Sequence, residues 1–336
     1  MITESFPGAR SLMKRERGGD SSAYSLPPLR SPEMDRVGIG HALVDDCSLS
    51  KACEVIIAHA QRRGRPAFVT TANAQHIVLL DGDKYLRDIY NNADLVVADG
   101  ISLILAARLH GRCLRERVAG VDMFQSLCAR AAESDLHVFL LGGRPGSAER
   151  AAMVFQQRSP RLRISTYCPP VGFERTKDGL ERTAEAVRST SPDLLFVGLG
   201  APKQEYWIYE HGLSLGVPMS IGVGGSFEMV SGVVSRAPRW VQGMGCEWLY
   251  RLCLEPRRMW RRYLIGNVSF ATIVARQGLR RALLSALFSF LDKDAFGAEV
   301  REPRLQQHQK ELVSRLFAVS AGDAPESRSS DVLGRV

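Results

Sequence analysis

The sequence predicts an α/β fold: a Rossmann-like parallel sheet with helices on both faces, followed by a helical, basic C-terminal appendage. Short apolar runs alternate with helical segments of about ten to fifteen residues, which is typical of parallel βαβ units. Some of these runs end in glycine turns, as in Gly198-Leu-Gly-Ala-Pro-Lys-Gln-Glu205. A hydrophobic content of 45% over 336 residues supports a full core for such a fold.

Each strand is predicted from an apolar run, and each helix from a longer segment between two such runs. In chain order, strands are expected at 37–44, 66–71, 94–98, 136–141, 162–167, 194–197 and 217–223. Helices are expected at 48–63, 74–92, 101–110, 121–132, 147–157, 178–189 and 203–213. Inside the helix at 74–92, Asp81-Gly-Asp83 resembles a metal-binding Asp-x-Asp. Because it interrupts a helical pattern, we interpret it as a helix break and cap.

The composition divides the chain into four parts. Residues 1–33 and 292–336 are polar and low in aromatic residues, which predicts disordered tails. Residues 34–235 hold the alternating pattern, and 236–291 form the appendage. The N-terminal segment has no apolar core of a signal peptide, and arginines interrupt the longest apolar stretch near the other end. We therefore expect neither a signal peptide nor a membrane span.

The net charge of +8 is concentrated in the appendage. Between residues 236 and 262, seven arginines accompany two glutamates, so this segment alone carries +5. Arg251, Arg258 and Arg262 are spaced to share one helix face. An apolar face is expected from four further residues, namely Leu249, Leu252, Met259 and Trp260. A basic helix with tryptophans is typical of a segment that binds an anionic membrane surface.

The cysteines and histidines give no sign of a disulfide framework or of a zinc site. The seven cysteines form no CxxC pair, so we expect free thiols in a reducing cytoplasm. The histidines are scattered singly, which gives no support to a Ser-His-Asp hydrolase. No cluster of His and Cys has the spacing of zinc ligands.

Polar residues follow two of the predicted strands at points where a ligand would lie. Thr71 and Asn73 end the first of them, although Thr and Asn are also preferred helix caps, and from the residues alone we favour a cap. Asp99 and Gly100 follow the second strand. A carboxylate at the mouth of a buried strand is suited to be a general base or to bind a sugar hydroxyl, and a helix cap is again the alternative.

Phosphate groups could be bound by an arginine and by two glycine turns. Arg117 could pair with a phosphate in a bidentate manner, whereas we interpret Asp122 as an ordinary helix cap. Gly142 and Gly143, like the turn that contains Gly200, follow a strand and precede a helix, which suits a pyrophosphate. The first turn lacks the Gly-x-Gly-x-x-Gly spacing, so it is a weak NAD fingerprint.

These motifs form an ordered set, namely Thr71-Ala-Asn73, Ala98-Asp-Gly100, Arg117-Val-x-Gly-x-Asp122, Leu141-Gly-Gly143, Gly198-Leu-Gly-x-Pro-Lys-Gln-Glu205, Arg236-Ala-Pro-x-Trp240 and Glu247-Trp-Leu-Tyr-Arg-Leu252. Over about residues 37–266 the chain resembles the WecG/TagA/CpsF glycosyltransferases. The resemblance implies inverting transfer of a hexose or N-acetylhexosamine (or its uronic acid) from a UDP-sugar to a polyprenyl-diphosphate-linked saccharide. The products of that family are precursors of cell-surface polysaccharides. It also implies a cytoplasmic enzyme, peripheral at the inner face of the membrane, that needs no metal and no cofactor; a homo-oligomer is compatible with it.

The resemblance also assigns roles to individual residues. It implies that Asp99 is the general base and that Thr71 is its partner in the active site. Further substrate-binding residues are expected along the motifs and in the appendage, namely Asn73, Gly100, Arg117, Gly142, Gly143, Gly200, Gln204, Arg251, Arg258 and Arg262. Of these, Gln204 is the expected ligand contact in its own turn.

Two other classes of protein fit part of the sequence. The arginines and tryptophans of the appendage would suit a non-catalytic nucleotide- or RNA-binding protein. However, the positive charge lies in one short region and no recognised nucleic-acid module is present, so we expect no nucleic-acid partner. The glycine turns taken alone would allow an NAD-dependent oxidoreductase.

Overall fold

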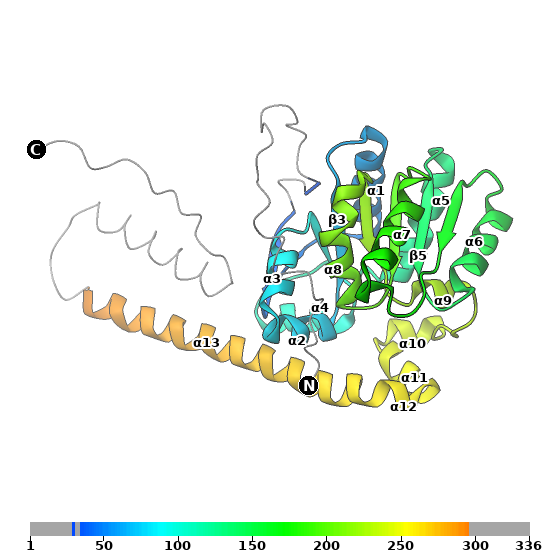
Figure 1. The fold of residues 1–336 in the computed structure, drawn as a ribbon. Coiled ribbons are helices and arrows are strands. Elements are labelled where there is room, and N and C mark those ends of the chain that lie inside the picture. Colours follow the sequence, from blue (N-terminus) through cyan, green and yellow to red (C-terminus); the bar gives the residue numbers. More distant parts are fainter. Residues whose placement is uncertain (1–28, 31–33, 296–336) are drawn as a thin grey trace, which may run out of the picture.

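The computed structural model describes residues 29–30 and 34–295 (Figure 1). At its centre is a six-stranded sheet with the strand order β4-β3-β8-β7-β5-β6, in which every neighbouring pair is parallel. The strands span Ala67–Ala72 (β3), Leu95–Ala98 (β4), Val138–Gly142 (β5), Ile164–Tyr167 (β6), Leu194–Gly198 (β7) and Met219–Gly222 (β8). The predicted parallel α/β sheet is confirmed.

Helices cover both faces of this sheet, as predicted. One face packs against α1 (Leu49–Arg62), α5 (Gly120–Glu133), α6 (Ser147–Arg158) and α9 (Ser226–Val230). The other packs against α2 (Ala74–Gly82), α3 (Lys84–Asn91), α4 (Ile101–Leu109), α7 (Lys177–Arg188) and α8 (Lys203–Glu210). Short 3₁₀ turns lie at Phe173–Arg175 and Gly212–Leu215. Along β5, Leu140 belongs to the first core and Phe139 to the second, because successive strand residues point to opposite faces.

The prediction of a single strand at 37–44 is wrong. The chain forms a separate antiparallel hairpin, β1 (Arg36–Ile39) and β2 (Ala42–Asp45). Gly40 allows the turn because its φ of +58° lies in the left-handed region. The hairpin is joined to the edge of the main sheet where Asp45 accepts a hydrogen bond from the Val96 backbone N–H at 2.7 Å.

The expected break in the helix at 74–92 is confirmed. Asp83 ends α2 and caps α3, since its carboxylate accepts the Leu86 backbone N–H at 3.0 Å. It also accepts a hydrogen bond from the Tyr206 hydroxyl. Asp81 instead lies 3.7 Å from a His41 nitrogen. Asp83 therefore stabilises the junction of α2 and α3, whereas Asp81 faces the turn between β1 and β2.

The appendage is helical but is not one continuous helix. It consists of α10 (Arg239–Gly243), α11 (Glu247–Leu254), α12 (Pro256–Trp260), a π-helical segment (Arg261–Ile265) and α13 (Gly266–Ala295). The expected single face of three arginines is wrong, because Pro256 lacks an N–H and disfavours helical geometry at Glu255. The expected apolar face is divided too: Met259 is buried, whereas Leu249 and Trp260 are exposed.

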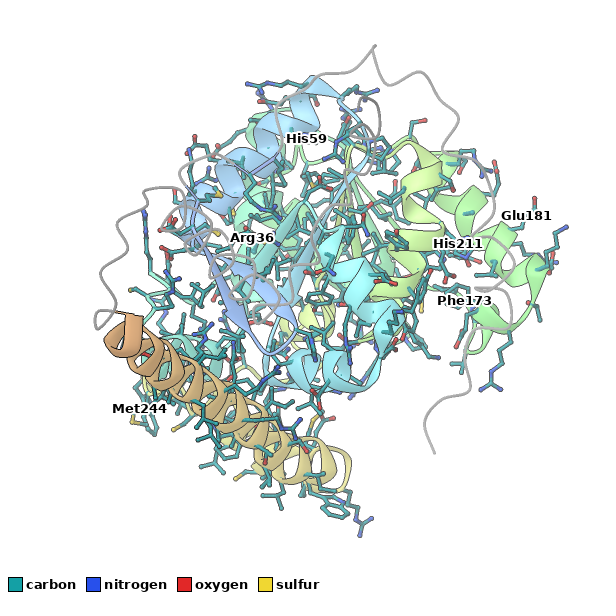
Figure 2. All side chains as sticks on the ribbon, turned by 90° about the vertical axis from the view of Figure 1, so that its left-hand side faces the viewer. Arg36, His59, Phe173, Glu181, His211 and Met244 are labelled. Atoms are coloured by element: carbon teal, nitrogen blue, oxygen red, sulfur yellow. The ribbon has the colours of Figure 1, made fainter. Side chains whose placement is uncertain are left out.

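The long helix α13 is fixed to the α/β domain through its first half. Phe270 and Ile273 are buried in the same core as α2. The Gln277 side chain accepts a hydrogen bond from the Gly40 N–H and donates one to the Gly38 carbonyl, both at 3.0 Å. Figure 1 shows α13 lying along α2 and continuing beyond the domain. In Figure 2, Met244 marks the appendage at the end of the molecule opposite to His59 of α1.

A few residues of the two predicted tails belong to the described part of the chain. Leu29 is buried, and Arg30 forms an ion pair with Asp45 at 2.7 Å. At the other end, α13 continues past residue 291 to Ala295. The rest of 1–33 and 292–336 lies outside the described residues. Within the described part of the chain, no helix combines the length and hydropathy that a membrane span requires.

We expect Gly143→Ala to lower the free energy of unfolding by roughly 2–4 kcal/mol, from left-handed strain and overpacking together. Gly143 has a φ of +82°, and a Cβ there would lie 2.4 Å from Ser147 Oγ and 3.0 Å from Phe227 Cδ2. Gly146 is the matched control, because its φ is +79° but a Cβ would meet nothing within 4 Å. Urea unfolding should show that Gly146→Ala costs clearly less; equal losses would refute the packing argument.

Candidate active site

A cavity of about 620 Å³ lies at the carboxyl ends of the central strands. The ends of β3, β4, β7 and β8 each contribute to its wall, and these four strands are neighbours in the sheet. Open α/β sheets bind their ligands at this edge. The lining includes six residues that were expected from the motifs after these strands, namely Thr71, Asn73, Asp99, Gly100, Gly200 and Gln204.

Asp99 is a carboxylate whose surroundings suit proton transfer. Burial raises its pKa to about 7; Arg117 lowers the pKa and Glu247 raises it. The Gly120 backbone N–H donates a hydrogen bond to the carboxylate. Asp99 does not cap α4, since the N-cap position is Gly100, which makes no side-chain cap. A base with a pKa near the working pH is the efficient choice for proton transfer.

Thr71 lies close to Asp99 across the first residue of α5. A Cβ built on Gly120 would lie 3.7 Å from both Asp99 Oδ2 and Thr71 Oγ1. The Thr71 hydroxyl donates to the Gly222 carbonyl at 3.0 Å, which joins β3 to β8 where the two strands end. The first residue of α5 therefore lies beside both side chains.

Asn73 is a helix cap that also lines the cavity. Its Oδ1 accepts the backbone N–H groups of Gln75 and His76 at 3.0 and 3.4 Å, and its own N–H donates to His76 Nδ1 at 3.3 Å. The expected cap is thus confirmed, in the form of a capping box. Because the caps occupy Oδ1, the Nδ2 amide is the group that Asn73 can offer to a ligand.

Gln204 belongs to a buried polar network behind the cavity wall. Its Oε1 accepts the Gly224 N–H at 3.0 Å, and its Nε2 donates to Glu205 Oε1 at 2.8 Å. His76 Nε2 lies 3.4 Å from the same Glu205 oxygen. The side chains of all three are buried, whereas Lys203 is exposed and pairs with Glu174. Both ends of the Gln204 amide therefore already have partners, and Gln204 holds the turn after β8 in place.

We expect Gln204→Met to lower the free energy of unfolding by roughly 2–5 kcal/mol, because it leaves the Gly224 N–H and the Glu205 carboxylate without this partner. Lys203→Met is the matched control, since it removes an exposed ion pair worth about 1 kcal/mol or less. Chemical denaturation measures both variants. If Gln204→Met were as stable as the control, the network would have no structural role.

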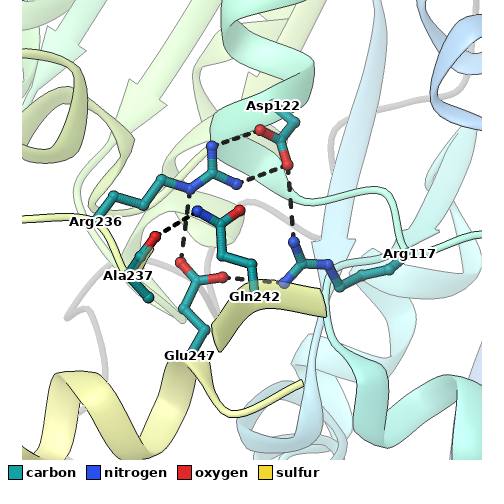
Figure 3. Close-up of polar contacts among 6 residues, drawn as sticks. All are labelled: Arg117, Asp122, Arg236, Ala237, Gln242 and Glu247. Carbon is teal, nitrogen blue, oxygen red and sulfur yellow. Dashed lines mark hydrogen bonds and ion pairs between the residues drawn. The ribbon is translucent and has the colours of Figure 1, made fainter. Parts of the chain in front are cut away.

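Four charged side chains connect the appendage to the cavity (Figure 3). Arg236 pairs with both oxygens of Asp122, at 2.6 and 2.7 Å. Arg117 donates to Glu247 at 3.0 Å and lies 3.9 Å from Asp122. The interpretation of Asp122 as a helix cap is wrong, because Ala119 holds the cap position of α5 and Asp122 lies in its first turn. Arg117 lines the cavity, but without a ligand its partners are carboxylates.

The appendage contributes one wall of the cavity. Its lining residues come from α11, α13 and the segments beside them, namely Gly245, Glu247, Trp248, Arg251, Tyr263, Asn267 and Phe270. Arg251 lies against the turn after β8, where a Cβ on Gly225 would be 3.7 Å from its Nη2. Its Nε is buried and has no hydrogen-bond partner among the described residues. Arg251 therefore contributes to the cavity wall beside the turn after β8.

The other expected binding residues lie elsewhere or are not described. Gly142 and Gly143 do not line this cavity, because β5 is the strand beyond β7 and the Gly143 N–H donates to the Gly198 carbonyl at 3.0 Å. Arg258 and Arg262 fall in the appendage helices, but their side chains lie outside the described ones. No group of three or more His, Cys, Asp or Glu residues within the described ranges could hold a metal ion.

Sequence reasoning missed several residues of the site. Glu247 was noted as part of a motif without a role, although it lies beside both Arg117 and Arg236. His76 and Glu205 carry no sequence signal of their buried contact, because only folding brings α2 next to α8. Asn267 and Phe270 lie beyond the last motif, on a helix whose docking is set by tertiary packing.

The fold and the cavity define an α/β protein with a small-molecule site at the carboxyl edge of its sheet. The model of the Glycosyl transferase WecG/TagA/CpsF family matches residues 37–283, and the chain belongs to this family. It is therefore a hexosyltransferase, and this assignment replaces the RNA-binding and oxidoreductase alternatives. The resemblance found from the motifs is confirmed.

Curated relatives agree with the family. The chain is 31% identical over 198 residues to an N-acetylglucosaminyldiphosphoundecaprenol N-acetyl-beta-D-mannosaminyltransferase of Bacillus subtilis. The matched residues make up 59% of this chain and 75% of the relative. A protein of the same name from Staphylococcus aureus is 28% identical over 215 residues, or 64% of this chain and 83% of the relative.

Proposed function

We propose that this protein transfers a hexose or N-acetylhexosamine unit from a UDP-sugar to a polyprenyl-diphosphate-linked saccharide, with inversion at the anomeric carbon. The observation that carries the proposal is the cavity, whose lining includes Asp99, with a pKa of about 7, together with Arg117 and Arg251. The names of the relatives support the acceptor class, since they act on an N-acetylglucosaminyl diphosphate of undecaprenol. The same names favour N-acetylmannosamine as the transferred sugar.

In this proposal the reaction is a single displacement. The Asp99 carboxylate removes the proton from the acceptor hydroxyl while the hydroxyl oxygen attacks the anomeric carbon. The bond between that carbon and the diphosphate oxygen breaks, and UDP leaves with the electron pair. Arg117 and Arg251 line the cavity and supply positive potential for the developing charge. The residues present can thus stabilise a diphosphate leaving group without a metal.

We further propose that the appendage docks on an anionic membrane at the inner face of the cytoplasmic membrane, where a lipid-linked acceptor would be held. Large apolar side chains of the appendage are exposed, among them Trp240 and Val268, each 68% exposed. Arg257 is exposed in the same region. An exposed combination of tryptophan, aliphatic and basic residues is what an interfacial helix presents to lipid headgroups.

A thermal-shift screen of UDP, UDP-glucose, NAD and RNA tests the donor class. We expect UDP and UDP-sugars to raise the melting temperature, because a ligand that binds the folded state alone stabilises it by mass action. NAD and RNA should leave it unchanged. Stabilisation by NAD or RNA but not by UDP would overturn the proposed donor.

A further inference from the structure

Glu247 places a negative charge in the wall of a cavity that, in the proposed function, receives a nucleoside diphosphate. Its Oε2 accepts a hydrogen bond from Arg117 Nη1 at 3.0 Å, and its Oε1 lies 3.8 Å from Arg236 Nε (Figure 3). The side chain is 18% exposed, so the carboxylate is largely withdrawn from water. A carboxylate in this place repels an anionic ligand unless a guanidinium neutralises it.

Arg117 is the residue for which Glu247 and a diphosphate would compete. Its guanidinium is 3.0 Å from Glu247 and 3.9 Å from Asp122, and its charge acts on Asp99. A phosphate offers arginine the same planar, two-oxygen geometry as a carboxylate. The displaced Glu247 would not lose all its partners, because its second oxygen already faces Arg236.

We propose that Glu247 is a positioning residue of the donor site. In the free enzyme its carboxylate forms an ion pair with the Arg117 guanidinium and holds it in place. When the diphosphate binds Arg117, the Glu247 carboxylate pairs with Arg236 instead. The inference rests on the proposed function, because it takes Arg117 as the diphosphate contact. Through this exchange of ion-pair partners, Glu247 of α11 takes part in donor binding. No bond is made or broken in this exchange beyond hydrogen bonds.

The same charge acts on the proposed base. The groups that face Asp99 are Arg117 and the Gly120 N–H near the start of α5, His76 of α2, Tyr90 of α3, and Arg236 and Glu247 of the appendage. After burial, which raises the Asp99 pKa most, Arg117 lowers it and Glu247 raises it. Loss of the Glu247 charge should therefore move the acid limb of the kcat/KM profile to lower pH.

Glu247→Gln tests the proposal, with Glu255→Gln as its matched control. Glu255 belongs to the same appendage and pairs with Arg144 at 2.8 Å, outside the cavity lining. Titration calorimetry should show that Glu247→Gln binds UDP about fivefold more tightly, the size expected when one ion pair no longer competes for Arg117. The acid limb should move to lower pH in this variant alone. Glu255→Gln should bind UDP like the wild type.

Unchanged or weaker UDP binding by folded Glu247→Gln would overturn the proposal. Glu247 would then have only a structural role, in holding the appendage to the domain. If UDP does not bind the wild type, the proposed donor fails, and inorganic pyrophosphate then decides the inference: tighter binding by Glu247→Gln supports it, and equal or absent binding overturns it. If the melting curve shows that the glutamine variant does not fold, Glu247→Asp takes its place. Its shortened carboxylate should give a smaller tightening, and none would contradict the proposal.

Discussion

Asp99→Asn should lower turnover by about 10²–10⁴-fold, the contribution of a positioned general base, while UDP binding persists. The amide keeps the size and the hydrogen-bond acceptor of the carboxyl group but cannot take the acceptor's proton. At pH 7 about half of the wild-type carboxyl groups are already neutral, because the Asp99 pKa is raised to about 7. UDP should thus bind the variant at least as tightly, since a neighbouring negative charge is removed. Steady-state kinetics and calorimetry measure the two quantities.

The pH dependence of the wild type checks the same assignment. Activity should rise with pH through about 7, because only the ionised carboxylate accepts a proton. Stability should change in the opposite direction. An unfolded aspartate has a pKa of about 3.9, so folded Asp99 keeps a proton that the unfolded chain releases, and stability falls as pH rises towards 7. Asp99→Asn should therefore gain melting temperature relative to the wild type over that range. Near-normal turnover, or a flat acid limb, would contradict the role of Asp99.

A chain that ends at residue 235 should lose both transfer activity and binding to anionic vesicles. The truncation removes the whole wall formed by α11, α13 and their neighbours, including Glu247 and Arg251. It also removes the exposed apolar side chains of the appendage. Vesicle sedimentation and a transfer assay measure the two losses. Vesicle binding that survives the truncation would refute the proposed docking surface.

A second variant separates membrane docking from damage to the domain. The truncation exposes the core that Phe270 and Ile273 cover, so its melting temperature must be compared with that of the full chain. Replacing Trp240 and Leu264 by serine leaves the cavity lining intact, because neither residue belongs to it. These side chains are 68% and 55% exposed, and their loss should weaken vesicle binding with little effect on UDP binding.

The sequence predicted the parallel sheet and most of the strand ends because those signals are local. An apolar run with polar residues at its end, such as the one before Asp99, predicts both a buried strand and the position of the side chain. The hairpin at Gly40 was missed, because the short, mainly apolar run at 37–44, with its two glycines, fits a single strand as well. Pro256 indicates a helix break in the sequence itself, but the spacing of the arginines favoured one helix across it.

The contacts within the site could not be predicted in the same way, because they join segments far apart in the chain. Asp122 is of a residue type that often caps helices, and only the folded structure shows its ion pair with Arg236, 114 positions away. Gln204 fits a ligand contact by motif, yet Gly224 and Glu205 use its amide. The ion pair of Arg117 with Glu247 spans 130 positions. Spacing patterns describe one helix or strand at a time and do not report such pairs.

The most direct measurement is the transfer reaction itself, with a synthetic polyprenyl-diphosphate N-acetylglucosamine as acceptor and a series of UDP-sugars as donors. UDP-N-acetylmannosamine, its uronic acid and UDP-glucose would be supplied singly, and mass spectrometry would identify the lipid product. One of these donors should yield an acceptor with one added sugar, and UDP should be released in equal amount. If no UDP-sugar extends the acceptor under conditions in which the protein is folded and bound to vesicles, the proposed transfer from a UDP-sugar is refuted.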